Sequence, residues 1–294
     1  MRCVPGCGGH RAGPTTKNAS NPLLLKLWAQ DSHAAQPLTN PRTRPARYRG
    51  GVQVVSVGYA AVKGTRHLAR PEVRIGPAGV VGDRRWCLVD VAARQVLRTV
   101  AHPRLMGLAV DGESFVAAGT VAAGSGTQVT CDYWGREVAL DLFDHPLAPR
   151  AARLLGLSPA RDVRLAAAPA RGVVYAGAVS LVALSTLEAL AAEVGAPVDP
   201  RRFRANLVVD TGLPPRAEEA WVGREVRVGG AVVRPAALTT RCAVVDHHPE
   251  TGERDLRVLA ALPVVGGAPV CGVDGEVVTA GVVRPGDPVE LLEP

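Results

Sequence analysis

The sequence predicts a mainly β protein of the α+β class with a few short helices, and three observations support this prediction. The 294-residue chain contains 32 Gly and 24 Pro but only 3 Phe and 2 Met, a composition that favours short strands and many turns. Its apolar segments are short, rich in β-branched residues, and end at Gly, Asp or Pro. In the first half these segments recur about every ten residues, a spacing that suggests a barrel or a sandwich.

Residues 1–50 carry the whole formal net charge of +7, with eight basic residues against one acidic residue. The rest of the chain holds 26 basic and 26 acidic side chains and is neutral. The high pI therefore gives no indication of a nucleic-acid-binding body, and we expect no nucleic-acid partner. The segment has little aliphatic pattern, so we predict a disordered basic tail, or an upstream extension from a misassigned start.

The cysteines and the apolar runs favour a cytoplasmic protein. No apolar run approaches the roughly 20 residues needed to cross a bilayer, so we expect no membrane partner. Leu23–Leu25 is too short for the apolar core of a secretory signal, and we expect six reduced cysteines without structural disulfides. Cys3, Cys7 and His10 have the spacing of metal ligands, but a second ligand pair is missing, and we expect no metal there.

The first half is predicted to be all β up to about residue 145, starting with the segment at 51–62. Further strands are predicted at 86–91, 94–100, 107–112, 114–119, 127–134 and 136–143. A helical connector follows at 145–157. The predicted boundary between the two halves lies near residues 150–170.

The second half begins with a strand at 172–184 and a helix at 185–195. Ser185 and Glu188 have the spacing of a capping box, and Gly195 is the expected C-terminal stop of this helix. An arginine-rich turn then leads into a strand. The remaining elements are predicted as a turn and strand at 199–212, two or three strands at 223–246, a short helix at 253–263 and two strands at 275–294.

Three segments carry more arginine than their apolar surroundings explain: Gly82–Asp90, Arg201–Asp210 and Thr239–Cys242. Each places arginine at the end of a strand, which is a rigid position for holding a ligand. Each alone is also typical of a solvated strand terminus. Together with Lys63 and the predicted helix start at Ser185–Thr186, they would suit an anionic ligand, because arginine forks and free helix amides bind phosphate.

Lys63 is the only lysine after residue 50. A GC-rich coding bias would explain why the other basic residues there are arginines. Lys63 is then either a chance survivor or a position that needs a compact ammonium, which the planar guanidinium of arginine does not supply.

Cys242 follows Arg241 directly, and a neighbouring cation favours the thiolate form of a cysteine. A thiolate can attack an electrophile, carry a persulfide or bind a soft metal. A nucleophilic hydrolase would need a histidine base, and His247 and His248 lie in a segment that is typical of an exposed turn. The alternative is that Cys242 is a small buried strand residue, and these alternatives remain open at this point.

The segments described so far resemble the MOSC-domain proteins, a family named for the C-terminal domain of molybdenum cofactor sulfurase. The resemblance runs from about residue 51 to the C-terminus. It is greatest to the two-domain group with an N-terminal MOSC β-barrel, to which the mitochondrial amidoxime-reducing component belongs. The segments that match in chain order are Ala60–Gly64, Gly82–Asp90, Leu184–Leu190, Arg202–Asp210, Thr239–Glu253 and Val283–Leu292.

This resemblance implies an N-terminal MOSC β-barrel domain at 51–165, a MOSC domain with its own β-barrel at 166–294, and a bound molybdenum cofactor, Mo-molybdopterin. Cys242 would be the thiolate ligand of molybdenum, and the pterin dithiolene would supply two more sulfurs. Asn206 would hydrogen-bond the pterin or an oxygen on the metal, and Thr186 would direct its hydroxyl and the helix N-terminus at the phosphate. The cations that would hold the phosphate and the pterin ring edges are Lys63, Arg84, Arg204 and Arg241.

The implied activity is an oxidoreductase that reduces N–O or S–O bonds of a small molecule by oxygen-atom transfer. No cysteine-rich, ferredoxin-like module follows Cys271, so the electrons would come from a separate reductase or ferredoxin-like partner. We expect the protein to be a monomer. Two alternatives are a sulfur carrier with a Cys242 persulfide, for metal–sulfur or cofactor assembly, and a non-catalytic protein that binds the cofactor.

Overall fold

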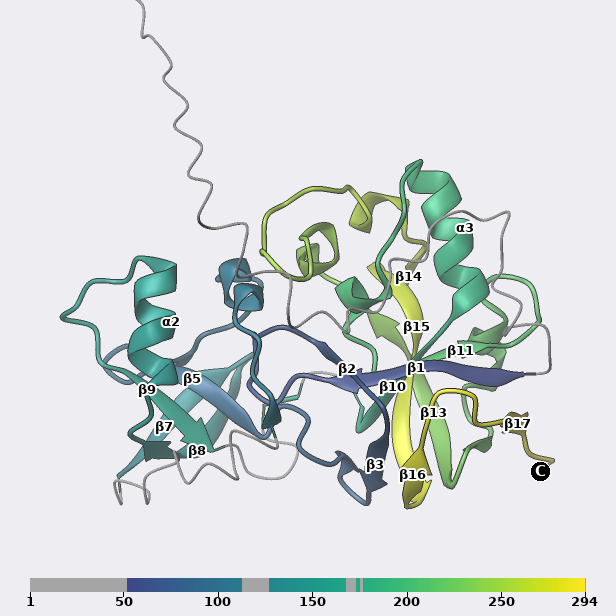
Figure 1. The fold of residues 1–294 in the computed structure, drawn as a ribbon, viewed down its shortest axis with the longest axis horizontal. Coiled ribbons are helices and arrows are strands. Elements are labelled where there is room, and N and C mark those ends of the chain that lie inside the picture. The colour runs from purple at the N-terminus through teal and green to yellow at the C-terminus, as the bar shows by residue number, and fades with distance from the viewer. Residues whose placement is uncertain (1–51, 113–126, 168–172, 175–176, 294) are drawn as a thin grey trace, which may run out of the picture. The chain divides into compact units, whose positions relative to one another are not determined.

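The computed structural model describes residues 52–112, 127–167, 173–174 and 177–293. The basic tail predicted for residues 1–50 and the strand predicted at 114–119 lie outside this part. Strands dominate the described residues, and the α-helices are α2 (Leu147–Leu155) and α3 (Leu184–Val194) (Figure 1). The predicted mainly β class is therefore confirmed. None of the helices in these ranges combines the length and apolar character needed to cross a membrane.

A closed barrel forms from strands between residues 86 and 167. Its strands are β5 (Trp86–Asp90), β6 (Gln95–Val96), β7 (Gln128–Tyr133), β8 (Arg136–Phe143) and β9 (Val163–Ala167). Along β8, Val138, Leu140 and Leu142 are buried while the residues between them are exposed. This period of two is expected of a strand with one face in a core. The barrel has an apolar cluster of its own, which also contains Cys87 and Cys131.

A nine-stranded sheet holds most of the second half (Figure 1). Its order is β17-β12-β13-β15-β10-β11-β1-β2, with β14 beside β15. Strands β10 and β11 are parallel, so the chain must cross over between them, and it does so through α3 and the 3-10 helix η3 (Pro200–Phe203). The strands are β1 (Gln53–Tyr59), β2 (Leu68–Arg70), β10 (Val179–Ala183), β11 (Leu207–Asp210), β12 (Val226–Val228), β13 (Ala231–Thr240), β14 (Val264–Val265), β15 (Ala268–Thr279) and β17 (Val289–Leu291).

The two halves of the chain share sheets. Strand β1 comes from the first half and pairs with both β2 and β11, while β3 (Val73–Gly76) pairs with β4 (Gly79–Val80) and with β16 (Gly281–Val283). The limits 51–165 and 166–294 stay predictions. Among the described residues closure is found only for β5–β9, so the second barrel predicted for 166–294 takes the form of the nine-stranded sheet.

Some predicted elements are shorter than expected, and one is absent. The strand predicted at 107–112 is not formed; the 3-10 helix η2 (Pro103–Gly107) precedes this stretch. Pro103 sits in the first turn of η2, where its fixed φ is tolerated, and η2 itself buries Leu105 and Met106. Of the helix predicted at 253–263, only η6 (Leu259–Ala261) is helical.

The predicted capping box at the start of α3 is wrong. The helix begins at Leu184, with Ala183 as its N-cap and no side-chain cap within this segment. The carboxylate of Glu218, in η4 (Ala217–Trp221), instead accepts a hydrogen bond from the Ala183 amide at 3.1 Å. The predicted stop is confirmed, because Gly195 ends α3 in the left-handed region with φ 74°.

Candidate functional site

Cys242 lies on a short exposed stretch between β13 and the 3-10 helix η5 (Ala243–Asp246). It is the N-cap residue of η5, and its carbonyl accepts a hydrogen bond from the Val245 amide at 3.2 Å. The residues that follow it, Val244 to Asp246, are buried and anchor this stretch. The thiol is free and exposed, so the alternative of a small buried strand residue is wrong.

Three cations lie close enough to Cys242 for the charge of a thiolate there to raise their pKa values: Lys63, Arg204 and Arg241. Burial is nevertheless the largest influence on each. It lowers the pKa of Lys63 to about 7, with further lowering by the charges of Arg84 and Arg204. Burial also lowers the pKa of Arg204 to about 9, again reinforced by Arg84. Crowded, partly desolvated cations are a strong attraction for an anion.

Arg84 is oriented by its neighbour Asp83 and points toward Arg204. It forms an ion pair with Asp83, and its Nη2 donates to the Arg204 carbonyl at 3.1 Å. The Asp83 carboxylate also accepts from the Ala60 amide at 3.2 Å. Both Arg84 and Arg204 have positive φ, 47° and 52°, in a region that non-glycine residues rarely adopt. The two arginines are therefore held in fixed and unusual backbone positions.

The Asn206 side chain hydrogen-bonds Asp83 and two neighbouring strands. Its side-chain oxygen accepts from the amide and the hydroxyl of Ser180, both at 3.1 Å. Its Nδ2 donates to Asp83 at 3.1 Å and to the Gly58 carbonyl at 3.4 Å. These contacts join β10 and β1 to the Asp83–Arg84 pair. Asn206 is therefore linked to Arg84 through Asp83, and its amide is already engaged by the protein.

Arg241 uses its guanidinium to tie backbone segments together. Nε and Nη2 donate to the Cys271 carbonyl at 2.9 and 2.7 Å, and Nη1 donates to the Phe203 carbonyl at 2.7 Å. Burial lowers its pKa. Arg241 therefore brings positive charge to the neighbourhood of Cys242, while its donors fix the end of η3 beside β15.

Thr186 is not directed at this group of cations. Its hydroxyl donates to the Glu218 carboxylate, 2.9 Å from each oxygen, and accepts from the Arg216 amide at 2.8 Å. Glu218 is fully buried, so Thr186 is one of the donors that satisfy a buried carboxylate at the start of α3. Thr186 therefore belongs to the start of α3 and not to the group of cations near Cys242.

Arg204 has an unused donor that could bind a ligand. Arg204 Nη2 is buried and has no hydrogen-bond partner among the described residues. A buried donor without an acceptor is costly and is rare in folded proteins. A phosphate oxygen placed there would supply the acceptor, so the residues present fit an anionic group between Lys63, Arg84 and Arg204.

Sequence reasoning missed two residues of this site. Asp83 lies in the arginine-bearing segment Gly82–Asp90, directly before Arg84, and an acid beside an arginine at a strand end was a usable signal. His67 follows Lys63 by four residues, and its ring lies so close to Gly58 that an added Cβ there would meet it at 2.7 Å. Burial, and then Arg204 and Arg84, hold the pKa of His67 well below its usual value, so the ring is neutral.

No three His, Cys, Asp or Glu side chains of the described residues gather to hold a metal ion. Cys242 therefore has no partner set of protein side chains with which to hold a metal among the described residues. The cluster Cys3, Cys7 and His10, where we expected no metal, lies outside the described residues. A metal on Cys242 would need further ligands from a bound cofactor.

Comparison with known proteins gives one family match. The family model of the MOSC domain matches residues 165–290. None of the curated proteins matches the chain. The crystal structure of the YuaD protein from Bacillus subtilis is 13% identical, with 82% of this chain and 94% of that chain covered and a TM-score of 0.42.

Two further solved structures align with a smaller part of the chain. YiiM from Geobacillus stearothermophilus is 19% identical, covers 40% of this chain and 55% of its own, and has a TM-score of 0.29. YiiM from Escherichia coli is 20% identical, covers 42% of this chain and 58% of its own, and has a TM-score of 0.30.

Proposed function

We propose, from the MOSC domain that the chain carries at residues 165–290, that this protein binds a molybdenum cofactor at Cys242 and reduces N–O or S–O bonds of a small molecule. The observation that carries the proposal is the exposed Cys242 thiol beside cations that include an unpartnered buried donor on Arg204. A soft ligand for the metal and an anion site for the pterin phosphate would thus lie together.

The phosphate of the cofactor would be held by Lys63, Arg84 and Arg204. Arg204 Nη2 offers a free donor, and Lys63 offers a compact ammonium. Arg84 is kept in place by Asp83, which is in turn held by Asn206. The roles of Asn206 and Arg241 are then to orient these cations and the Cys242 stretch, because their own polar atoms are engaged.

Cys242 would bind molybdenum as a thiolate. Sulfur is a better ligand for a soft metal centre than an alcohol oxygen. The exposure of the thiol leaves the metal side of the site open to a small-molecule substrate. When bound, the molybdenum cofactor supplies two-electron oxygen-atom transfer, and the protein orients it and tunes its electrostatics. The electrons would come from a separate reductase or ferredoxin-like partner.

The test is to purify the full chain from a host that makes the cofactor and to measure molybdenum and pterin per protein. We expect close to one of each. Turnover of an amidoxime or a sulfoxide with a chemically reduced electron donor then tests the reaction. Molybdenum and pterin without any turnover would leave a non-catalytic cofactor-binding protein, and their absence would overturn the proposal.

The exposed, free thiol of Cys242 also favours a second candidate, a sulfur carrier that holds a persulfide on Cys242 and delivers it for metal–sulfur or cofactor assembly. The two functions differ in what the purified protein contains. Sulfane sulfur on Cys242 in the absence of molybdenum would support the carrier, and stoichiometric molybdenum would contradict it.

A further inference from the structure

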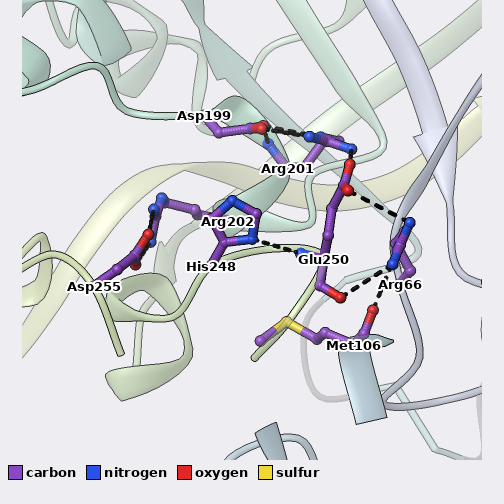
Figure 2. Close-up of polar contacts among 8 residues, drawn as sticks. All are labelled: Arg66, Met106, Asp199, Arg201, Arg202, His248, Glu250 and Asp255. Carbon is purple, nitrogen blue, oxygen red and sulfur yellow. Dashed lines mark hydrogen bonds and ion pairs between the residues drawn. The ribbon is translucent and has the colours of Figure 1, made fainter. Parts of the chain in front are cut away.

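We infer that Glu250 is a positioning residue that holds together the three chain segments carrying Lys63, Arg204 and Cys242. The purpose of that arrangement rests on the proposed function, but the arrangement itself does not. Glu250 lies in the segment after Cys242 that the sequence predicts to be an exposed turn. Figure 2 shows its side chain extended between Arg201 and Arg66.

The contacts of Glu250 reach both other segments. Arg201 Nη1 donates to Glu250 Oε1 at 2.7 Å. Arg66 Nη1 lies 3.6 Å from Oε2, and Arg66 Nη2 donates to the Glu250 carbonyl at 3.1 Å. The neighbouring arginines, Arg201 first, lower the pKa of Glu250 and keep it a carboxylate. One residue thus uses its side chain and its backbone to bind two arginines.

Each arginine is close in sequence to a cation of the candidate site. Arg66 follows Lys63 by three residues, and Arg201 precedes Arg204 by three. The Arg204 amide donates to the Arg201 carbonyl at 3.1 Å, which closes η3. A displacement of Arg201 would therefore reach Arg204 through one hydrogen bond, and a displacement of Arg66 would reach Lys63 through a short turn.

The turn that carries Glu250 is itself fixed to the protein. The Glu250 amide donates to His248 Nδ1 at 3.2 Å, and the Gly252 amide donates to the His248 carbonyl at 2.9 Å. Gly252 has φ 76°, and an added Cβ there would meet the Pro103 carbonyl oxygen at 2.1 Å. Glu250 is therefore presented by a rigid turn, and its hold on the two arginines sets where Cys242 lies relative to the cations.

The same region contains a matched control, also drawn in Figure 2. Asp255 binds Arg202 in bidentate fashion, at 2.8 and 2.7 Å. This pair joins η3 to the chain after Cys242, as Glu250 does, but no contact of Asp255 with the Lys63 segment is found among the described residues. Arg202 is buried, so Asp255→Asn is expected to lower the melting temperature at least as much as Glu250→Gln.

The experiment measures how fast iodoacetamide alkylates Cys242 in the full-length apoprotein at pH 7, by mass spectrometry of the peptide that contains it. We expect Glu250→Gln to slow alkylation at least 3-fold, because the stretch that carries Cys242 is then no longer held beside the cations Lys63 and Arg204. Asp255→Asn should change the rate less than 2-fold. A purely electrostatic role of Glu250 predicts the opposite sign, since the variant removes one negative charge while Arg201 stays paired with Asp199.

Arg66→Gln gives an independent check, because it removes one arm and leaves the Arg201 contact. It should slow alkylation by less than Glu250→Gln. The double variant should be slowed at least as much as Glu250→Gln, because Glu250→Gln alone keeps the contact of Arg66 with the Glu250 carbonyl. An unchanged or faster rate in Glu250→Gln, or an equal loss in Asp255→Asn, would overturn the inference. If Glu250→Gln does not fold, Arg66→Gln decides, and a rate equal to wild type overturns the inference. Molybdenum content is measured separately, so slowed alkylation in a protein that never binds molybdenum keeps the role of Glu250 and removes only the proposed function.

Discussion

The interior of the β5–β9 barrel and the stretch around Cys242 both hold cysteine, and they treat it in opposite ways. Cys87 and Cys131 are fully buried in the barrel, where burial raises the pKa of each thiol. Cys242 is exposed beside Lys63 and Arg204. Lys63 borders both regions, since its ammonium lies 5.4 Å from the ring centroid of Tyr133 in the barrel. Environment therefore separates two buried thiols from an exposed thiol beside cations.

The largest expected effect comes from Cys242→Ser, which nearly preserves volume. We expect molybdenum retention and turnover to fall more than 100-fold, because serine lacks the soft sulfur ligand. The melting temperature should be unchanged, since the side chain is exposed. Cys87→Ser and Cys271→Ser are the controls. Both should keep the metal, although a hydroxyl buried without a partner lowers stability by about 1–3 kcal/mol. Wild-type metal content in Cys242→Ser would show that Cys242 does not bind the metal and does not differ from the buried cysteines in this respect.

The next effect tests whether Thr186 belongs with the structural region. Thr186→Val removes the hydroxyl that donates to the buried Glu218 carboxylate. The expected loss is about 1–3 kcal/mol of unfolding free energy, measured by urea denaturation, with unchanged cofactor content. A drop in cofactor content without a loss of stability would return Thr186 to the candidate site.

A smaller effect concerns the protonation of Lys63. Its pKa of about 7 in the folded protein lies below the ordinary lysine value of 10.5, so its charge is present below pH 7 and lost above it. Binding of inorganic sulfate to the apoprotein should therefore weaken by up to about tenfold per pH unit above pH 7. Calorimetry from pH 6 to 9 measures this, because sulfate keeps its own charge throughout.

Two variants of Lys63 serve as references for this titration. Lys63→Ala should bind sulfate weakly and independently of pH, and Lys63→Arg should keep part of the affinity. The sign for stability is the reverse of that for binding. Protonated Lys63 destabilises the fold fully below pH 7, and this penalty is relieved as the pH rises toward 10.5. Equal sulfate affinity at pH 6 and pH 9 in the wild type would show that Lys63 does not bind the anion, and its presence would then be due to chance.

The smallest expected effect is that of removing residues 1–50. They hold the whole net charge and little apolar pattern, so they are expected to bury little. A protein that starts at Gly51 should keep its melting temperature within about 2 °C, which for a domain of this size is less than about 1 kcal/mol, and should keep its cofactor. Loss of folding would show that the tail contributes to the core.

The sequence predicts the fold class and several site residues because their signals are local. Alternation of apolar and polar residues along β8 and the helix stop at Gly195 depend only on neighbours in the chain. Cys242 and Lys63 stand out in the same way, one by its flanking arginine and one as a lone lysine. Local composition is therefore enough to find the mainly β class and these two residues of the site.

Long-range partners account for what the sequence does not predict. The cap of α3 comes from Glu218, so the spacing of Ser185 and Glu188 gives a false capping box. Glu250 has the local sequence of an exposed turn, and its role depends on Arg66, which is 184 residues away. Asn206 is recognised from its motif, but the contacts that occupy its amide come from Ser180 and Asp83, on other segments.

The left-handed backbone at Arg84 and Arg204 shows a trade-off between folding and ligand recognition. Glycine would adopt these φ angles without steric conflict, yet both positions hold a long charged side chain that is also partly desolvated. Because of these two positions, the folded protein without ligand is less stable than a variant with glycine at each position could be. An anion that binds the folded form alone returns stability by mass action. The protein is thus expected to reach its full stability only with its ligand, so occupancy and folding would be selected together.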